Sequence, residues 1–291
     1  MSVNRASPTS HSYFAQGLRL HYLDWGNPEA PPLLLVHGNR DHCHNWDWVA
    51  QELRDDYHIL APDFRGHGDS ERILGGNYNH TGYLYDLAQL IHQQNLAPLK
   101  VIAHSLGGSV ALRYAGAYPE NIEKMIVIEG TGGPGWMYQE VPVHERIRNW
   151  VDSTRASAGR SPRRYGSLED AFERMQAENK HLSESQARHL TAHGSNQNED
   201  GSYSWKFDNQ PHVMAPFDLT LDQTQTLWSR ITAPLLLISG SESQFGQHQK
   251  EDITRYFPDA RSLVFENAGH WVQHDQLDRF VSEARLFLKD A

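Results

Sequence analysis

The sequence predicts an α/β fold, in which a mostly parallel sheet is flanked by helices and a mainly helical segment is inserted late in the chain. Short apolar runs alternate with amphipathic helical patterns, which is typical of a parallel sheet covered on both faces. The alternation fails between about residues 134 and 229, where helix signals continue without a long apolar strand. With 291 residues, the chain is long enough for one large domain or two smaller ones.

Seven segments have the pattern of strands. Residues 18–25 alternate between apolar and polar side chains as an exposed edge strand does. The others are short apolar runs, as expected of buried parallel strands. These runs are residues 33–36, 58–61, 101–103, 125–128, 235–238 and 262–265. Ligands bind at the carboxyl ends of strands in such a sheet, so residues just after these runs are candidates for chemistry.

Apolar residues at helical spacing predict core helices around residues 84–91 and 277–288. In the inserted segment, Ser167 precedes the same spacing, and Ser183 with Gln186 forms a capping box. Asp200-Gly201 predicts the turn of a short hairpin. Large apolar side chains of this segment are expected to form its own core and to line a pocket; they are Trp136, Met137, Tyr138, Trp150, Trp205, Met214, Phe217 and Trp228.

Composition disfavours several classes of partner. The net charge of −10 disfavours nucleic acid and anionic membranes. The mean hydropathy is −0.65, and no apolar run approaches the roughly 18 residues that a membrane-spanning helix requires. The polar opening lacks the apolar stretch of a signal peptide, and a single cysteine excludes an internal disulfide and fits a reducing compartment. We therefore expect a cytoplasmic protein.

The cysteine lies in the stretch DHCHNW, in which His42 and His44 flank Cys43. Two histidines at i and i+2 do not share a helix face, and we identify no second cluster with ligand spacing. The sequence therefore predicts no metal site, and it indicates no cofactor.

The stretch VIAHSLGG, residues 101–108, places Ser105 between a strand pattern and a helix pattern. Such a corner is typical of the nucleophile elbow G-x-S-x-G, which tolerates only small residues two positions before and after the serine. Those positions are Ala103, in place of the first glycine, and Gly107. On this pentapeptide alone, a serine that merely caps a helix is an equal alternative.

Four motifs in order and spacing resemble the α/β-hydrolase superfamily over essentially the whole chain. They are HGNRDHCHNW at 37–46, DFRGHGDS at 63–70, AHSLGG at 103–108 and NAGHWV at 267–272. The resemblance implies an eight-stranded, mostly parallel sheet flanked by helices. It also implies a core of residues 1–133 and 229–291 with a cap domain at 134–228. Arg65, Gly66 and Gly68 are expected to shape a turn near the site.

The resemblance implies that Ser105 is a nucleophile and that His270 is the base that takes its proton. The position where such enzymes usually have the triad aspartate falls in ISGSESQFG, residues 238–246, and holds Ser243. Two carboxylates could substitute, Glu129 at the end of MIVIE and Glu242 beside the vacant position. We favour Glu129, because some relatives supply their acid from that strand.

The resemblance further implies an oxyanion hole formed by the backbone N–H groups of Asn39 and Leu106. The expected function is hydrolysis of an apolar small-molecule carboxylic ester through an acyl-enzyme. A serine at position 105, with Leu106 in place of a halide-binding tryptophan, argues against a haloalkane dehalogenase. Hydrolysis of a carbon–carbon bond, lactone or thioester is the alternative activity, and a noncatalytic binding protein is the alternative class. Acyl chain length and oligomeric state stay open.

Overall fold

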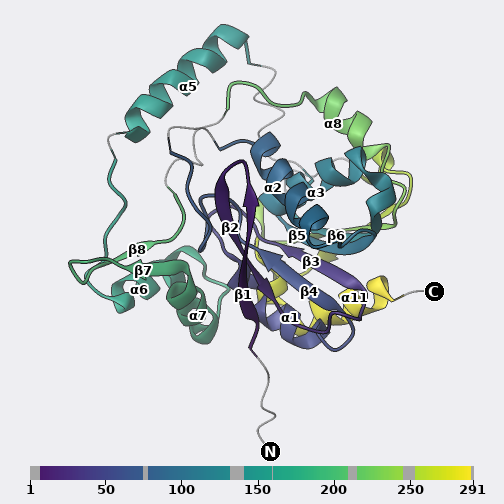
Figure 1. Ribbon diagram of the computed structural model, residues 1–291, viewed down its shortest axis with the longest axis horizontal. Helices are drawn as coiled ribbons and strands as arrows, with labels where there is room; N and C mark the ends of the chain where they lie inside the picture. The colour runs from purple at the N-terminus through teal and green to yellow at the C-terminus, as the bar shows by residue number, and fades with distance from the viewer. Residues whose placement is uncertain are drawn as a thin grey trace, which may run out of the picture.

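The computed structural model describes residues 7–74, 78–131, 141–158, 160–208, 215–244 and 253–289. Their centre is an eight-stranded sheet in the order β1-β2-β4-β3-β5-β6-β9-β10 (Figure 1). The first two pairings, β1 with β2 and β2 with β4, are antiparallel, and the remaining pairings are parallel. The predicted mostly parallel, eight-stranded sheet is confirmed.

All seven predicted strand segments are strands, and one strand precedes them. The strands are β1 (Thr9–Ala15), β2 (Leu18–Asp24), β3 (Pro32–Val36), β4 (His58–Pro62), β5 (Leu99–His104), β6 (Ile122–Ile128), β9 (Leu235–Gly240) and β10 (Ala260–Phe265). The prediction that residues 18–25 form the exposed edge is wrong. The edge strand is β1, which is mostly exposed, and it covers β2 so that four consecutive residues of β2 are buried.

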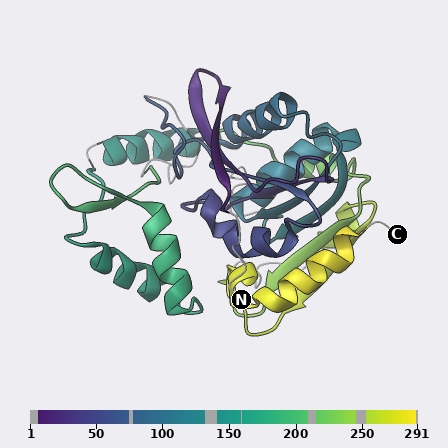
Figure 2. The ribbon, with the colours of Figure 1, turned by 60° about the horizontal axis from the view of Figure 1, so that its bottom comes forward.

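Helices cover both faces of the sheet (Figures 1 and 2). On one face, α2 (His80–Gln93), α3 (Leu106–Ala117) and α8 (Leu221–Trp228) pack on one apolar cluster. On the other face, α1 (Asp47–Leu53), α10 (Val272–Asp275) and α11 (Leu277–Leu288) pack on a second cluster. Short 3-10 helices are η1 (Cys43–Trp46), η2 (Pro119–Asn121) and η4 (Ile253–Tyr256). Both predicted core helices are confirmed.

The inserted segment is mainly helical, as predicted. It contains α5 (Val143–Ala158), α6 (Leu168–Glu178), α7 (Glu184–Gly194) and a hairpin of β7 (Ser195–Gln197) and β8 (Tyr203–Trp205). Both capping boxes are present, one at Ser167 and one at Ser183. Gly201, in the hairpin turn, has a φ of +81°, a conformation that glycine adopts without strain.

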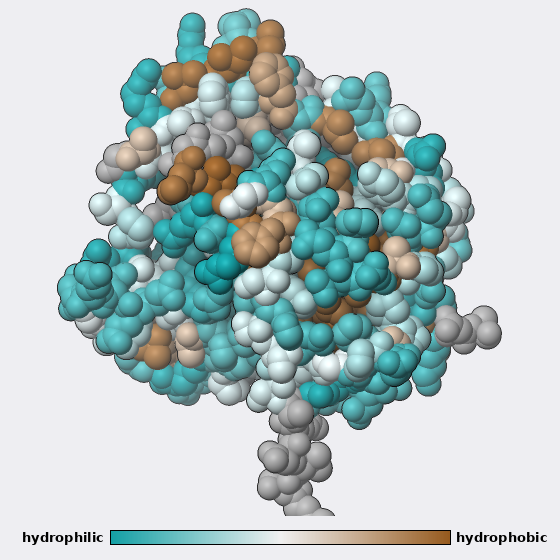
Figure 3. All heavy atoms as spheres, in the orientation of Figure 1, coloured by the Kyte–Doolittle hydropathy of each residue, from teal (hydrophilic) through white to brown (hydrophobic). Residues whose placement is uncertain are grey.

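The large apolar residues predicted for this segment have different environments. Trp205 lines a cavity, Trp228 lies in the core cluster on α8, and Phe217 is 64% exposed. Trp136, Met137, Tyr138 and Met214 lie outside the described residues. Helix α5 has no buried residues, and its exposed stripe of Val143, Ile147 and Val151 contributes the apolar surface at the upper left of Figure 3.

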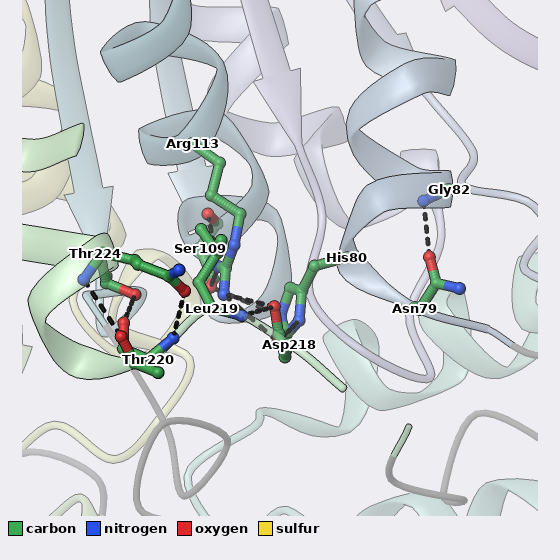
Figure 4. Close-up of polar contacts among 10 residues, drawn as sticks. Asn79, His80, Gly82, Ser109, Arg113, Asp218, Leu219, Thr220 and Thr224 are labelled. Carbon is green, nitrogen blue, oxygen red and sulfur yellow. Dashed lines mark hydrogen bonds and ion pairs between the residues drawn. The ribbon is translucent and has the colours of Figure 1, made fainter. Parts of the chain in front are cut away.

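The chain that returns from the inserted segment is fixed to α2 and α3 through Asp218 (Figure 4). The Asp218 carboxylate accepts a hydrogen bond from His80 Nδ1 at 2.6 Å and lies 3.4 Å from Arg113 Nη2. Burial raises the pKa of Asp218, but the hydrogen bond from His80 and the proximity of His80 and Arg113 outweigh burial and lower this pKa to about 2. Ser109 Oγ accepts from Arg113 and lies 3.5 Å from His80 Nε2, a distance too long for an activated nucleophile. We interpret this network as structural, since it holds the returning chain against α2 and α3.

The DFRGHGDS turn is rigidly built, as expected for a structural element. A Cβ atom added to Gly68, whose φ is +51°, would lie 2.2 Å from the Asp63 carboxylate. Arg65 donates from Nε and Nη2 to the two carboxylate oxygens of Asp86, each at 2.5 Å. This bidentate pair is almost fully buried, so it anchors the turn to α2.

Replacing Arg65 with leucine is expected to lower the free energy of unfolding by about 3–5 kcal/mol, because Asp86 would stay buried without its partner. Urea unfolding followed by circular dichroism measures this loss. In the matched double variant Arg65→Leu, Asp86→Leu, most of the loss should be recovered, since an apolar pair replaces a buried ion pair at little cost. A loss below about 1 kcal/mol in the single variant would contradict an anchoring role.

Candidate active site

Ser105 lies at the predicted corner between β5 and α3. Its backbone has φ 51° and ψ −117°, a conformation that is strained for a residue with a side chain. The corner is held by two backbone hydrogen bonds: Ser105 N donates to Ile128 O at 2.9 Å, and Ser109 N donates to Ser105 O at 3.1 Å. The predicted strand-to-helix corner, with a strained backbone at the serine, is therefore present.

Close packing around Ser105 explains the small residues of the motif. A Cβ atom added to Gly107 would lie 2.5 Å from the backbone oxygen of His37, and one added to Gly108 would lie 2.8 Å from Gly130 Cα. Backbone atoms cannot move aside as a flexible side chain does, so glycine is required at both positions. Ala103 is fully buried, and its methyl group is accommodated.

Glu129 follows β6 directly and contacts His270. Its carboxylate is fully buried, and His270 Nδ1 donates to Glu129 Oε2 at 2.5 Å. Glu129, like Ser105, has a positive φ, +48°, so two strained residues follow neighbouring parallel strands. The His270 loop is held by Gly269 N, which donates to Asp275 Oδ2 at 2.7 Å.

Ser243, at the position where an aspartate is usual, donates from Oγ to Glu129 Oε2 at 2.5 Å. Gly240 N donates to the other oxygen, Oε1, at 3.0 Å. Three donors therefore hold the Glu129 carboxylate, and its orientation toward His270 is fixed. Glu242 lies elsewhere: its carboxylate is 3.4 Å from His181 Nε2 of the inserted segment and half exposed.

His104, the residue before Ser105, also contacts His270. Its Nε2 donates to the backbone oxygen of His270 at 2.9 Å, and the two ring centroids are 4.5 Å apart. Burial, followed by the proximity of His270, lowers the pKa of His104 well below its usual value. His104 is therefore a neutral support for the His270 loop.

The loop of residues 37–39 faces Ser105. A Cβ atom added to Gly38 would lie 3.2 Å from Ser105 Cβ and 2.7 Å from His104 Nδ1. Asn39 is exposed at the end of this loop, and its side-chain Oδ1 lies 3.3 Å from His67 Nε2. Leu106 is the first residue of α3, where backbone N–H groups have no partner within the helix. Of the two predicted oxyanion positions, Leu106 therefore follows Ser105 directly in the chain, and Asn39 belongs to the loop that faces Ser105.

Two cavities, each of about 560 Å³, lie beside these residues. The first is lined by His270, His104, Asn39 and Ser243, together with residues 178–182 of the inserted segment. The second shares Asn39, Glu178, Asn179 and Trp271 with the first. Its walls include the aromatic rings of Tyr165, Trp205 and Phe207 and the cations Arg40, Arg160, Arg163, Arg174 and Lys206. The sequence analysis expected an apolar substrate and did not predict these cations.

Sequence reasoning missed two contributors to this site. Ser243 was interpreted only as a lost aspartate, although a serine hydroxyl at that position can hydrogen-bond a carboxylate on the neighbouring strand. His104 was overlooked, although it directly precedes Ser105.

Within the described part of the chain, no helix is both long and apolar enough to cross a bilayer.

Comparisons with known proteins agree with this architecture. A family model described as alpha/beta hydrolase fold matches residues 31–277. The chain is 26% identical to Epoxide hydrolase 4 of Mus musculus, covering 99% of this chain and 82% of the relative. It is also 26% identical to Esterase YbfF of Escherichia coli K12, with 89% and 93% covered.

Among solved structures, the thioesterase domain from the curacin biosynthetic pathway superposes with a TM-score of 0.82 at 22% identity, covering 98% of this chain and all of that domain. At this identity the likeness concerns the fold. The family model covers most of the chain and fits the observed sheet, so the chain belongs to the α/β-hydrolase fold family.

Proposed function

We propose that the chain is a serine hydrolase that cleaves carboxylic esters through an acyl-enzyme, with Ser105, His270 and Glu129 as its triad. The observation that carries this proposal is the hydrogen bond of 2.5 Å from His270 Nδ1 to the buried Glu129 carboxylate. A buried carboxylate on Nδ1 fixes the tautomer in which Nε2 accepts a proton, and it stabilises the imidazolium formed during the reaction.

In the proposed mechanism, His270 Nε2 takes the Ser105 proton as Oγ attacks the ester carbonyl carbon. The developing oxyanion is stabilised by the backbone N–H groups of Asn39 and Leu106. His270 then returns the proton to the leaving alcohol, and the acyl group stays on Ser105. A water molecule gives a proton to His270 as it attacks this acyl-enzyme, and His270 returns that proton to Ser105 Oγ as the bond to the acyl group breaks and the acid is released.

The similar proteins include both an esterase and an epoxide hydrolase, which supports hydrolase activity of the family type. Ester hydrolysis is favoured because the nucleophile position holds a serine, and a serine hydroxyl suits acyl transfer. Epoxide hydrolases and dehalogenases of this fold attack carbon with an aspartate. Thioester, lactone and carbon–carbon hydrolysis need the same groups and are the alternative reactions.

We expect a fluorophosphonate probe to label the protein at one site, and mass spectrometry of the digested chain should place the adduct on Ser105. With a p-nitrophenyl ester, a burst of one p-nitrophenol per chain should precede steady turnover, because the acyl-enzyme accumulates. Esters of graded acyl length, a lactone, a thioester and an epoxide form the substrate panel. No labelling and no burst would support a binding protein, and turnover of the epoxide without labelling would exclude the serine mechanism.

A further inference from the structure

The side chains of three histidines and one aspartate lie close together between the core and the inserted segment. His44 and Asp47 lie in η1 and at the start of α1, and His189 and His193 lie one turn apart on α7. One ring nitrogen of each histidine and one oxygen of Asp47 all lie within 4.8 Å of one another. Side chains from two parts of the chain 142 residues apart, Asp47 and His189 among them, thus converge on one point.

The Asp47 carboxylate is at the centre of this cluster. His44 Nδ1 and His189 Nε2 both donate to its Oδ2 atom, each at 2.9 Å. His193 stacks on His44 with ring centroids 3.7 Å apart, and its ring is 4.5 Å from that of His189. Asp47 Oδ1 is buried, and no described residue donates a hydrogen bond to it. A buried carboxylate oxygen without a donor is costly, so the cluster as it stands is incompletely satisfied.

An ordinary surface ion pair does not account for this arrangement. The side chains of His44, Asp47 and His189 are only 17, 16 and 29% exposed. The nearby cation Lys206 is paired with Asp69 at 2.8 Å, so its charge is compensated.

The same four groups are a ligand set of the kind Zn²⁺ takes, which is four-coordinate with imidazole nitrogen and carboxylate oxygen. His-x-x-x-His on a helix puts both rings on one face, a spacing common in zinc sites. The prediction of no metal site rested on the spacing of His42 and His44 and on finding no second cluster with ligand spacing, and it overlooked His189 and His193, which are four residues apart. In the structure His42 Nε2 is instead hydrogen-bonded to Leu190 O at 3.1 Å, and the partners of His44 come from α1 and α7.

We propose that His44, Asp47, His189 and His193 bind one divalent transition-metal ion of the Zn²⁺ type. Four protein ligands complete a tetrahedral shell and leave no position for substrate, so the ion is structural. It ties α7 to η1 and α1, while Leu190 and Gly194 of α7 line the second cavity. The metal thereby fixes one wall of that cavity, and its site is independent of the catalytic assignment.

The test uses the full chain, freed of metal by a chelator and titrated with Zn²⁺ alone. We expect calorimetry to show one Zn²⁺ per chain with a Kd below about 10 μM, and Tm to rise with added Zn²⁺. The double variant His189→Gln, His193→Gln should bind Zn²⁺ at least about 100-fold more weakly and lose the rise in Tm. It loses two direct ligands, and even the loss of a residue that only supports a ligand weakens metal binding by about 10- to 100-fold. His144→Gln, which removes a 72% exposed histidine on α5, is the matched control and should bind as the parent does.

Co²⁺ provides a second readout, because a four-coordinate site with these ligands gives an intense visible absorption. This absorption should be present in the parent and in His144→Gln and absent in the double variant. If the double variant fails to fold by circular dichroism, Asp47→Asn replaces it and should weaken Zn²⁺ binding at least about tenfold. No Zn²⁺ binding by the parent, or equal affinity in the parent and in the folded ligand variants, overturns the proposal.

Discussion

Replacing Ser105 with alanine is expected to lower kcat for ester hydrolysis by about 10⁶-fold, because the acyl-enzyme can no longer form. Replacing His270 with alanine should cost about as much, since a serine hydroxyl without its base is a weak nucleophile. Stopped assays with a p-nitrophenyl ester over long times measure such low rates. Circular dichroism and Tm should change little, because Ser105 Oγ takes no part in the backbone hydrogen bonds that hold the corner.

The double variant Ser105→Ala, His270→Ala is the sharper part of this prediction. Two residues that act as one unit are not additive, so the double variant should be no slower than either single variant. Full additivity, with two independent losses multiplied together, would contradict a nucleophile–base pair. A Ser105→Ala variant with more than about a tenth of the parent activity would remove Ser105 from the mechanism altogether.

The parts of the fold that could be predicted from sequence are those set by local pattern. Buried parallel strands are short apolar runs, and a strand corner that excludes side chains needs glycines, so β5 and the elbow at Ser105 were both predictable. The edge strand β1 was not, because its sequence, TSHSYFA, is mostly exposed in the fold and lacks the apolar run of a core strand. Without β1, residues 18–25 had to be taken as the edge.

The candidate site shows the same limit. Glu129 was a candidate acid from the sequence, because it directly follows an apolar strand, as Ser105 does. Ser243 could not be assigned a function, because its hydrogen bond to Glu129 spans 114 residues and depends on the pairing of β6 with β9. His189 and His193 likewise meet Asp47 only after α7 folds against the core. Sequence spacing shows which side chains share a face, but not which faces meet.

Replacing Glu129 with glutamine should lower kcat by about 10⁴-fold with little change in fold stability, because the amide can hold the wrong His270 tautomer and cannot stabilise the imidazolium. Glu242→Gln is the matched control and should keep near-parent activity, since its carboxylate lies beside His181 and is half exposed. Steady-state kinetics with one ester, run on both variants, separate the two candidates. Loss of activity in Glu242→Gln with near-normal turnover in Glu129→Gln would reassign the acid.

Ser243 allows the acid to be moved to the neighbouring strand. Glu129→Ala alone should be about as slow as Glu129→Gln, and adding Ser243→Asp should recover at least about tenfold of the lost kcat. The reason is geometric: Ser243 Oγ and His270 Nδ1 both lie 2.5 Å from Glu129 Oε2, so a carboxylate at 243 starts within reach of the same ring nitrogen. Recovery by Ser243→Asp would show that His270 needs a carboxylate on Nδ1 from either strand. Failure of recovery in a folded double variant would mean that Glu129 acts through more than its charge at that nitrogen.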